Sequence, residues 1–502
     1  MMSAIIETLM QRAELTPDRI AFIGCSHSSD QVMRLSYAQL LEKVKGYASI
    51  LESLQPHCIA LRAENSLDWV IADLAAMYIK LPIVPIPMFF TAEQIRHTLD
   101  SAGVDLLLGD WPDTLSASLA QPLAVTIGSL DVWKICDVQP ARLLPHSAKV
   151  TFTSGSTGTP KGVCLSSQHL ATVSMTLKEA IATQAKCDTH LVLLPLSTLL
   201  ENITGIYVPI MLGASSVVLR GEDVGLVGSS QFDAQRFAHA LASYQPNSLV
   251  LTPALLMALI HVAKQDAALV ASLVFVAVGG ARVAPQLMQY AHAMHIPAFE
   301  GYGLSECGSV VSLNTPSQLK MGTCGRVLPH SKVMIAPDGE VLVKDNVALG
   351  YINQPFNEQW LATGDLGSLD EQGYLSITGR KKNQIITSFG RNVSPEWVES
   401  EAQIFAPLRT MVVVGEGQQH LTAVVDGGDQ SLVLSAIEQL NQKLPDYANI
   451  GDVITVSDLR SYHHLFTSNG RPIRQAFESW LSDTNVPSSV QRISIAPMPI
   501  HS

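Results

Sequence analysis

The stretch TFTSGSTGTPKG, residues 151–162, combines glycines, hydroxyl side chains and a single lysine, Lys161. Glycines allow backbone N–H groups to approach an anion closely, while the hydroxyls add hydrogen-bond donors and the lysine adds a positive charge. Residues 148–150, directly before the stretch, are predicted to form a strand. The stretch is not a Walker A loop, because Pro160 precedes the lysine and Gly162 follows it. It predicts a loop that holds a polyphosphate, and a flexible linker is the less favoured interpretation.

Short apolar runs alternate with helical patterns on both sides of this loop, up to about residue 320. The runs are continuously apolar, which favours parallel strands covered on both faces. The stretches 233–244 and 285–294 have helical spacing instead. Together these patterns predict an α/β body with parallel or mixed sheets. The predicted strands are residues 58–61, 82–86, 106–108, 190–194, 215–219, 248–251 and 274–278.

The pattern changes at residue 322. Glycines separate short alternating segments up to residue 378, which predicts a small β unit within the first domain. About 120 residues with both β and α signals follow. We place a domain boundary at residues 379–383, which gives a large layered N-terminal domain, residues 1–379, and a smaller α+β C-terminal domain, residues 380–502.

The composition indicates a folded protein with several cores. The chain has 502 residues, so we expect about three structural units at roughly 150 residues per domain. Hydrophobic residues make up 47% and charged residues only 15%, against about 25% in an average protein, which excludes a disordered or fibrous chain. The formal net charge is −12, so we expect no nucleic-acid partner. A small basic pocket for a phosphate-bearing ligand is compatible with this charge.

The cysteines and the N-terminus favour a soluble cytoplasmic protein. The seven cysteines form no CxxC pair, so we expect reduced thiols rather than disulfides or a sulfur-ligated metal. Glu7 and Arg12 interrupt the first apolar stretch, which is typical of an amphipathic helix and not of a signal peptide. No run reaches the ~20 apolar residues of a transmembrane segment. The mean hydropathy of +0.22 is compatible with weak peripheral membrane association.

Further motifs follow the glycine-rich stretch in a fixed order: 279–281 (GGA), 302–306 (YGLSE), 363–365 (TGD) and 379–382 (GRKK). With residues 153–162 they resemble the adenylate-forming (ANL) superfamily of AMP-binding enzymes. This superfamily includes acyl- and aryl-CoA synthetases, nonribosomal peptide adenylation domains and firefly-type luciferases. The resemblance covers about residues 150–475, and Ser305 stands where the family usually has threonine.

The resemblance implies a nucleotide site built from these motifs. Gly280 and Ala281 would border the adenine, and Tyr302 can stack on a purine. Asp365 can accept hydrogen bonds from both ribose hydroxyls, and Arg380 can donate to the same sugar. The remaining nucleotide-binding residues would be Thr153, Ser154, Gly155, Ser156, Thr157, Gly158, Thr159, Gly303 and Ser305.

The implied reaction has two halves, with ATP, Mg²⁺ and a thiol as its cofactors. A carboxylate attacks the α-phosphate of ATP to give an acyl-adenylate and pyrophosphate, and a thiol then displaces AMP to give a thioester. The substrate carboxylate is itself the nucleophile, so the protein supplies charge neutralisation and positioning. Lys161 and Glu306 would be catalytic, and Glu306 is a hard oxygen donor suited to Mg²⁺.

One position departs from the family pattern near the C-terminus. The family's last motif ends in Gly-Lys, whereas residues 467–474 are TSNGRPIR, so Arg471 holds the lysine position. Arginine keeps the charge but is larger and planar. Our hypothesis is that Arg471 is catalytic and stabilises the transition-state charge. The alternatives are a solvated arginine and, for the whole protein, a degenerate nucleotide-binding homologue without ligase activity.

The resemblance also implies that the C-terminal domain rotates between the two half-reactions. Lys382 occupies the hinge position, where torsion changes can set kcat. Gly390 would line the tunnel through which the thiol reaches the acyl group, because glycine allows a thin pantetheine arm to pass close to the backbone.

The expected acyl pocket begins in the segment LPLSTLLEN, residues 194–202. Thr198 stands where the family commonly has histidine or an aromatic residue, and Leu199 and Ile203 would add apolar surface. Burial of each CH₂ group contributes about 0.8 kcal/mol, so we favour a medium- or long-chain fatty acid, with an aryl acid next. Packing in the core is the alternative role for these apolar residues.

The sequence leaves two candidates for the acceptor thiol: CoA and the phosphopantetheine of an acyl or peptidyl carrier protein. CoA and a carrier share the reacting arm and differ outside the tunnel. Most carriers are acidic, and the net charge of −12 mildly disfavours such a partner. A stand-alone enzyme that loads a carrier is therefore the second candidate, after a CoA ligase.

Overall fold

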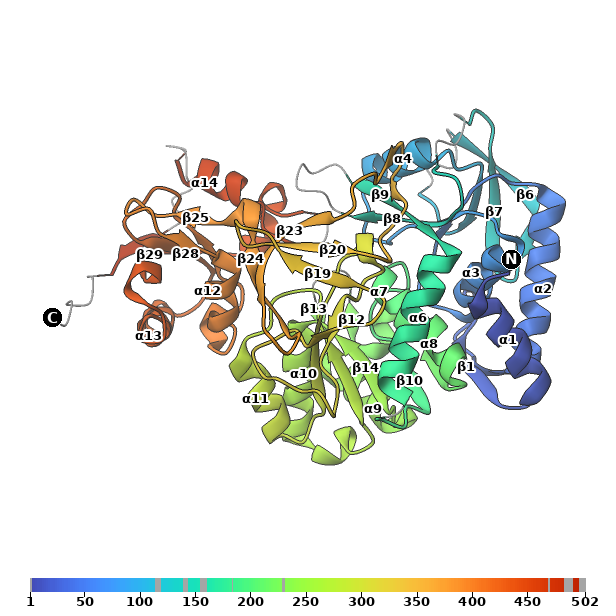
Figure 1. The fold of residues 1–502 in the computed structure, drawn as a ribbon, viewed down its shortest axis with the longest axis horizontal. Coiled ribbons are helices and arrows are strands. Elements are labelled where there is room, and N and C mark those ends of the chain that lie inside the picture. Colours follow the sequence, from blue (N-terminus) through green and yellow to red (C-terminus); the bar gives the residue numbers. More distant parts are fainter. Residues whose placement is uncertain are drawn as a thin grey trace.

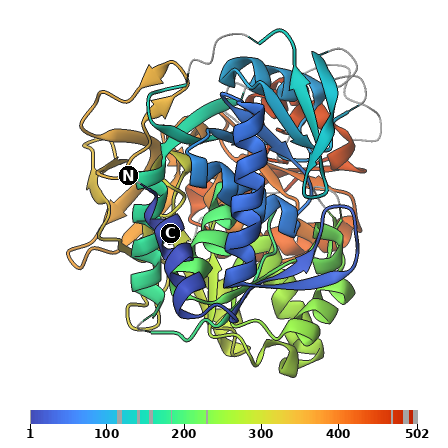
Figure 2. The same cartoon turned by 90° about the vertical axis from the view of Figure 1, so that its right-hand side faces the viewer.

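Two nine-stranded sheets form the larger body of the protein, and a smaller lobe lies beside it (Figure 1). The computed structural model describes residues 2–112, 119–138, 143–153, 160–182, 184–227, 231–467, 470–482 and 491–495. The C-terminal segment forms the smaller lobe, coloured orange to red in Figure 1, while α1 and α2 lie at the opposite end of the body (Figure 2).

The first sheet has the order β18-β17-β16-β15-β14-β10-β11-β1-β2. The strands from β16 to β1 pair in parallel, and β2, β17 and β18 add antiparallel edges. The strands are β1 (Ile20–Cys25), β2 (Val32–Ser36), β10 (Thr189–Leu191), β11 (Ser215–Val218), β14 (Ser248–Leu251), β15 (Phe275–Val278), β16 (Ala298–Tyr302), β17 (Ser312–Leu313) and β18 (Arg326–Val327).

The second sheet has the order β22-β21-β9-β8-β4-β3-β5-β7-β6. Its centre, from β8 to β5, is parallel, and its outer strands are antiparallel. The strands are β3 (Ile59–Arg62), β4 (Ile83–Pro85), β5 (Leu106–Gly109), β6 (Ala120–Ile127), β7 (Leu130–Ile135), β8 (Ser147–Thr153), β9 (Lys161–Ser166), β21 (Gly350–Tyr351) and β22 (Gln354–Pro355).

Helices cover both sheets and fill the space between them. The main core joins residues of both sheets to α1 (Ala4–Leu15), α2 (Tyr37–Leu54), α3 (Leu67–Ile79), α6 (Ser167–Ala182) and α8 (Val208–Leu212). The outer face of the first sheet packs against α9 (Ala234–Tyr244), α10 (Pro253–Gln265) and α11 (Pro285–Ala293), and that of the second packs against α4 (Ala92–Ala102). Between α7 (Leu199–Asn202) and α8 the chain forms a π-helical turn, Ile203–Tyr207. Within the described residues, no helix has the length and apolarity that crossing a bilayer requires.

A third, antiparallel sheet has the order β19-β20-β23-β24 and connects the body to the C-terminal lobe. Its strands are β19 (Lys332–Ile335), β20 (Glu340–Lys344), β23 (Leu361–Leu369) and β24 (Leu375–Arg380). The 3₁₀ turn Lys381–Asn383 follows β24 directly. The C-terminal lobe then has cores of its own, built on the sheet β27-β28-β29-β30.

The other elements of the C-terminal lobe surround that sheet. Its strands are β27 (Val412–Val414), β28 (Leu421–Asp426), β29 (Ile450–Val456) and β30 (Gln491–Ser494), and its helices are α12 (Pro395–Ala402), α13 (Gln430–Asn441) and α14 (Arg474–Ser482). The short hairpin β25 (Ile385–Ile386) and β26 (Asn392–Val393) precedes α12. The body also carries the short hairpin β12 (Leu226–Val227) and β13 (Gln231–Phe232).

The predicted α/β class with a smaller C-terminal region, which contains both strands and helices, is confirmed. The continuously apolar runs form parallel strands, and β14 matches the predicted range 248–251. The run 190–194 forms a shorter strand than expected, because β10 ends at Leu191. The alternating segments after residue 322 form the third sheet. The boundary at residues 379–383 remains a prediction, and the turn Lys381–Asn383 lies within it.

A buried polar cluster joins the strand before the glycine-rich stretch to the central helices. Lys149 on β8 donates from Nζ to Asp73 Oδ1 at 2.6 Å, to the Tyr207 hydroxyl at 2.7 Å and to the Asn202 side-chain oxygen. The Tyr207 hydroxyl donates in turn to Asp73 Oδ2 at 2.6 Å. Burial lowers the pKa of Lys149, and the Asp73 carboxylate opposes that shift. The cluster therefore fixes β8 against α3 and the π-helical turn at several points.

Glu300 on β16 is a second buried titratable group. Its Oε1 atom accepts a hydrogen bond from Cys324 Sγ at 3.5 Å. Burial raises the pKa of Glu300 from 4.5 to about 7, while the Cys324 contact and the Arg282 charge act in the opposite direction. Because the carboxyl group is protonated more readily in the native protein, its ionisation disfavours the folded state.

Asp73→Ala is expected to destabilise the body by about 3–5 kcal/mol, because it leaves the Lys149 ammonium buried without its counter-ion. Urea unfolding midpoints of the full chain measure the effect. Asp131→Ala on β7 serves as the control, since Asp131 is exposed and its loss should change stability by less than about 0.5 kcal/mol. Equal, small effects of the two variants would contradict a stabilising role of the cluster.

Glu300→Gln is expected to change how stability depends on pH. Between about pH 4.5 and 7 the native carboxyl group retains a proton that the unfolded chain releases, so wild-type stability falls as pH rises through this window. This difference between the native and the unfolded pKa corresponds to about 3 kcal/mol of folding free energy. The free energy of unfolding of the variant, relative to that of the wild type, should therefore rise by up to that amount between pH 4.5 and 8. Urea unfolding measures this difference. The exposed Glu371→Gln is the control, and an offset that does not vary with pH would refute the assignment.

Candidate active site

The two ends of the glycine-rich stretch face one another across a strand pair. Thr153 at the end of β8 pairs with Lys161 at the start of β9. This pairing follows from the antiparallel hairpin in which β8 leads into β9. The predicted phosphate-loop residues Ser154, Gly155, Ser156, Thr157, Gly158 and Thr159 lie outside the described residues. Thr153 and Lys161, on either side of these residues, are thus placed side by side at the end of the β8–β9 strand pair.

Lys161 and Glu306 meet at the ring of Tyr351. Lys161 Nζ lies 5.2 Å from the centroid of the Tyr351 ring, and the Tyr351 hydroxyl donates to Glu306 Oε1 at 2.8 Å. Glu306 lies on the 3₁₀ turn Ser305–Cys307, which follows the end of β16, and Tyr351 lies on β21 beside β9. Two residues predicted to be catalytic are therefore joined through a third that the sequence did not single out.

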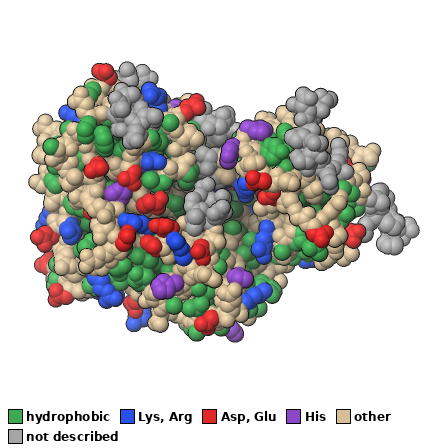
Figure 3. Space-filling model, turned by 180° about the vertical axis from the view of Figure 1, so that it is seen from behind, with side chains coloured by type: hydrophobic (Ala, Val, Ile, Leu, Met, Phe, Trp, Pro, Cys, Tyr) green, Lys and Arg blue, Asp and Glu red, His purple; other side chains and the backbone are tan. Residues whose placement is uncertain are grey.

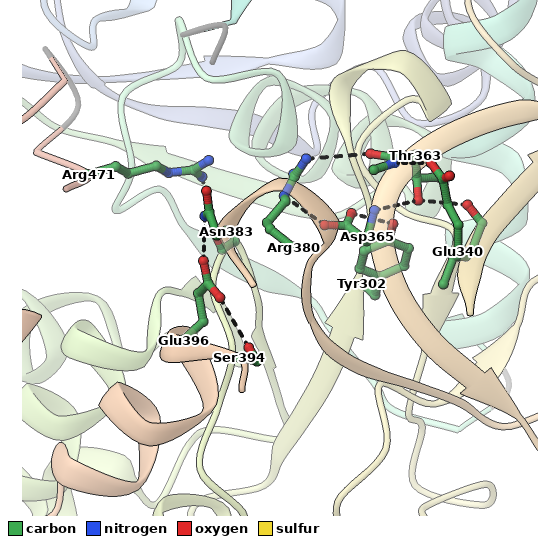
Figure 4. A network of polar contacts seen from close by, with 12 residues as sticks. Tyr302, Glu340, Thr363, Asp365, Arg380, Asn383, Ser394, Glu396 and Arg471 are labelled. Carbon is green, nitrogen blue, oxygen red and sulfur yellow. Dashed lines mark hydrogen bonds and ion pairs between the residues drawn. The ribbon is translucent and has the colours of Figure 1, made fainter. Parts of the chain in front are cut away.

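Tyr302, Asp365 and Arg380 form a second group at the end of the third sheet (Figure 4). The Tyr302 hydroxyl donates to Asp365 Oδ2 at 2.7 Å, and Arg380 Nε lies 2.7 Å from Asp365 Oδ1. Asp365 and Arg380 are cross-strand partners of β23 and β24, which explains their contact. The side chain of Asp365 is only 6% exposed, whereas that of Arg380 is 40% exposed. Burial raises the pKa of Asp365, and Arg380 opposes the shift.

Two glycines allow the backbone of this group to pack closely. A Cβ atom at Gly303, directly after Tyr302, would lie 2.0 Å from the Ser309 carbonyl oxygen, so only glycine fits. Gly280 has φ +80°, the left-handed region that glycine adopts without strain. Both Gly280 and Ala281 are exposed, as expected of backbone that borders a ligand. Ser305 opens the turn that carries Glu306.

Arg471 approaches this group from the C-terminal lobe (Figure 4). Its Nη2 atom donates to the Gly280 carbonyl oxygen at 3.3 Å. The loop is held locally, because the Arg471 backbone exchanges hydrogen bonds with Thr467 and Arg460 Nη1 donates to the Gly470 carbonyl at 2.9 Å. α14, which follows, is fixed by Arg474, whose two Nη atoms contact the Glu399 carboxylate at 2.7 and 2.8 Å.

The junction of the two lobes concentrates positive charge. The residue Arg471 is exposed as a whole, but burial of its guanidinium lowers its pKa, and the Arg380 charge adds to that shift. Burial also lowers the pKa of Lys382, with further contributions from Arg380 and Arg471. Cations that lower one another's pKa repel, so the arrangement favours binding of an anion. Seen from behind, the surface is indented between the larger body and the smaller lobe (Figure 3).

Glu306 fits a magnesium ion that is shared with phosphates. Among the described residues, no group of three or more His, Cys, Asp or Glu side chains forms a metal site. A single carboxylate is sufficient for Mg²⁺, which usually keeps several waters and binds through one or two carboxylates and substrate phosphates. The recorded Tyr351 contact engages only one Glu306 oxygen, Oε1.

Two of the three predicted acyl-pocket residues are packed in the core in this arrangement. Thr198 is exposed, while Leu199 and Ile203 belong to the main core and are 4% and 0% exposed. Glu201, between them, is buried and faces His190 on β10 at 3.4 Å. A surface pocket of about 380 Å³ lies elsewhere, between α6 and the edge strands β17 and β18. The assignment of an acyl pocket to these residues remains a prediction.

The expected thiol-tunnel residue lies away from the gathered groups. Gly390, with φ +70°, sits at the tip of the β25–β26 hairpin next to Phe389, which is 73% exposed. The neighbouring Ser388 N–H donates to the Gln418 carbonyl within the same lobe. Arg471 and Gly390 therefore do not reach the Tyr302 group together, and the tunnel role of Gly390 remains a prediction.

Two functional candidates escaped the motif analysis. Tyr351 stands in a glycine-punctuated segment that shows only β pattern, and its partners become visible through the pairing of β21 with β9. Arg282, directly after Ala281, donates from Nη1 to the carbonyls of Ile377 and Thr378 at 2.7 and 3.2 Å. It thereby ties the Gly280 turn to the strand that ends at Arg380. The position of Arg282 directly after the GGA motif is the sequence signal that could have identified it.

Comparison with known proteins identifies the family. The model of the AMP-binding enzyme family matches residues 9–353. Over 488 residues the chain is 26% identical to a long-chain-fatty-acid–CoA ligase, FadD15, of Mycobacterium bovis, covering 80% of this chain and 77% of that protein. It is 28% identical over 421 residues to a 2-succinylbenzoate–CoA ligase of Enterococcus faecalis, covering 78% and 82%.

The fold agrees with this result. The O-succinylbenzoate coenzyme A synthetase (MenE) of Bacillus subtilis, solved in complex with ATP and magnesium ion, matches with a TM-score of 0.74 at 20% identity. The match covers 94% of this chain and 99% of that one. The resemblance to the adenylate-forming superfamily is thereby confirmed, and the chain belongs to the AMP-binding enzyme family, as an enzyme of the AMP-forming acid–CoA ligase type.

Proposed function

We propose that this protein uses ATP to convert a carboxylic acid to an acyl-adenylate, with release of pyrophosphate, and then transfers the acyl group to CoA, with release of AMP. The observation that carries the proposal is the approach of Arg471 to Gly280, beside the Tyr302–Asp365–Arg380 group. A cation of the C-terminal part thus meets an aromatic and an acidic side chain of the larger part, with Arg380 at the boundary, at a surface suited to a nucleotide. The relatives that are CoA ligases support CoA as the acceptor.

The chain's own residues have separate tasks in the first half-reaction. Tyr302 offers an aromatic face to the base, and Asp365 offers a carboxylate to the ribose hydroxyls. Lys161 and Arg471 stabilise negative charge that develops on the α-phosphate as the substrate carboxylate attacks it and pyrophosphate leaves. Glu306 would hold Mg²⁺, which when bound would supply additional charge neutralisation on the phosphates.

The second half-reaction needs a different arrangement of the lobes. The CoA thiol attacks the acyl carbonyl, loses its proton, and AMP leaves with the former carboxylate oxygen. We propose residues 1–379 and 380–502 as the two rigid parts and Lys382 as the hinge. The position of Lys382 in the turn Lys381–Asn383, directly after β24, supports this division. Rotation there would exchange the Arg471 loop for the loop that carries Gly390.

We favour a medium- or long-chain fatty acid as substrate, with an aryl acid as the second candidate. The long-chain-fatty-acid–CoA ligase among the relatives supports a fatty acid. Leu199 and Ile203 are apolar and follow the expected entrance at Thr198, but in this arrangement both are buried in the core. The 2-succinylbenzoate–CoA ligase among the relatives supports an aryl acid instead. The acid panel in the next experiment separates the two.

Pyrophosphate release tests the function directly. The protein is mixed with ATP, Mg²⁺ and a panel of fatty and aromatic acids, with and without CoA. We expect release that depends on the acid, fatty acids above aryl acids, and a thioester only when CoA is added. Release that never yields a CoA thioester would favour loading of a carrier protein. Silence across the whole panel would favour a nucleotide-binding homologue without ligase activity.

Arg471→Ala should separate the two half-reactions. Loss of one positioned donor to a developing oxyanion typically lowers kcat by about 10²–10³-fold, and we expect that loss in adenylate formation. Thioester formation from supplied acyl-adenylate and CoA should be retained, because Arg471 serves only the first step. Arg409→Ala, an exposed arginine of the same lobe, is the control. An equal loss in both halves would contradict this division of labour.

A further inference from the structure

Tyr351 is placed between two groups of opposite charge that the sequence positions far apart. On β21 it pairs with Val163, two residues after Lys161 on β9. Side chains two residues apart share a face of a strand, so the Tyr351 ring can reach the lysine on the diagonal. The Lys161 ammonium lies over that ring, 5.2 Å from its centroid.

The same side chain contacts the acidic partner at its other end. The Tyr351 hydroxyl donates to Glu306 Oε1 at 2.8 Å, and the Ala348 N–H donates to the Glu306 carbonyl at 2.7 Å. The ring is fixed from the side by Phe356, whose centroid lies 5.1 Å away at an interplanar angle of 86°. Tyr351 therefore has a defined orientation and is half-buried rather than free to rotate.

The charges on its two sides attract one another. An ammonium and a carboxylate that reached one another would form a direct ion pair, and each would then satisfy the other instead of a ligand. Among the described side chains, Lys161 and Glu306 make no such pair, and both instead contact Tyr351. The ring face holds the cation by a cation–π contact, and the hydroxyl holds one carboxylate oxygen.

We propose that Tyr351 is a positioning residue that keeps Lys161 and Glu306 apart and directs both toward the phosphates of ATP and their magnesium ion. The inference rests on the proposed function, because it assumes that these phosphates bind between the two charges. The hydroxyl acts through Glu306 and so affects the contribution of magnesium to ATP binding. The ring acts through Lys161 and so affects ATP binding with or without magnesium.

Calorimetric ATP titrations of the full-length protein, with Mg²⁺ and with EDTA, separate these two effects. Tyr351→Phe removes only the hydroxyl, and we expect the gain in ATP affinity on adding Mg²⁺ to fall about tenfold while affinity in EDTA stays unchanged. Tyr351→Leu also removes the ring, and affinity in EDTA should then fall severalfold as well.

A double-mutant cycle excludes a merely structural effect. In a Glu306→Gln background the magnesium-dependent gain is already reduced, and Tyr351→Phe should add nothing to that loss. Tyr374→Phe is the matched control, because Lys320 Nζ lies 5.4 Å from the Tyr374 ring and no predicted site residue is involved. It should leave ATP binding unchanged in both buffers.

Three outcomes would overturn the role of Tyr351. One is wild-type binding by Tyr351→Phe, a second is an equal loss with and without Mg²⁺, and a third is an undiminished loss in the Glu306→Gln background. A wild-type protein that binds magnesium and ATP together but releases no pyrophosphate would refute the proposed function, and the binding cycle could still be interpreted. A wild-type protein that binds no ATP would overturn both proposals.

Discussion

Three cations, Arg380, Lys382 and Arg471, meet at the junction of the two lobes and face the carboxylates Asp365 and Glu396. These three positive charges outnumber the two negative ones, and burial lowers the pKa of both Lys382 and Arg471. Repulsion between cations is stronger where they are partly buried, so a bound anion would stabilise this arrangement. The geometry of the site thus depends on electrostatic demand for a polyanion, in a protein whose net charge is −12.

The rest of the architecture holds the parts of this junction at fixed places. Tyr302 ends a parallel strand of the first sheet, while Asp365 and Arg380 are cross-strand partners in the third. Lys161 begins β9 in the second sheet, whose neighbour β8 is fixed by the buried Lys149–Asp73 pair. Parallel strands carry ligand groups at their carboxyl ends, and here three sheets contribute to one region. Rigid strand ends therefore position side chains that come from distant parts of the sequence.

Sequence patterns were sufficient for the elements and for the local motifs. Continuously apolar runs gave the parallel strands, and the order of motifs indicated Tyr302, Asp365 and Arg380 before their mutual contact was visible. Tyr351 could not be found in this way, because its role depends on β21 pairing with a strand nearly two hundred residues earlier. The apolar residues Leu199 and Ile203 show a second limit of sequence patterns, which do not distinguish a core residue from a pocket residue. Core packing and pocket lining require the same side chains, and both residues are packed in the core in the present arrangement.

The contacts between the lobes are consistent with a C-terminal domain that can move. Among the described residues beyond the turn Lys381–Asn383, one hydrogen bond crosses between the lobes, from Arg471 to the Gly280 carbonyl. Each lobe has its own hydrophobic core. Relative motion of two domains is expected unless the interface between them is large and hydrophobic. Phe389, beside Gly390 at the hairpin tip, is 73% exposed in this arrangement. If the C-terminal domain rotates as proposed, ligand charge would select between the two arrangements, because a polyanion favours the one in which Arg471 contacts the Gly280 carbonyl and its departure removes that preference.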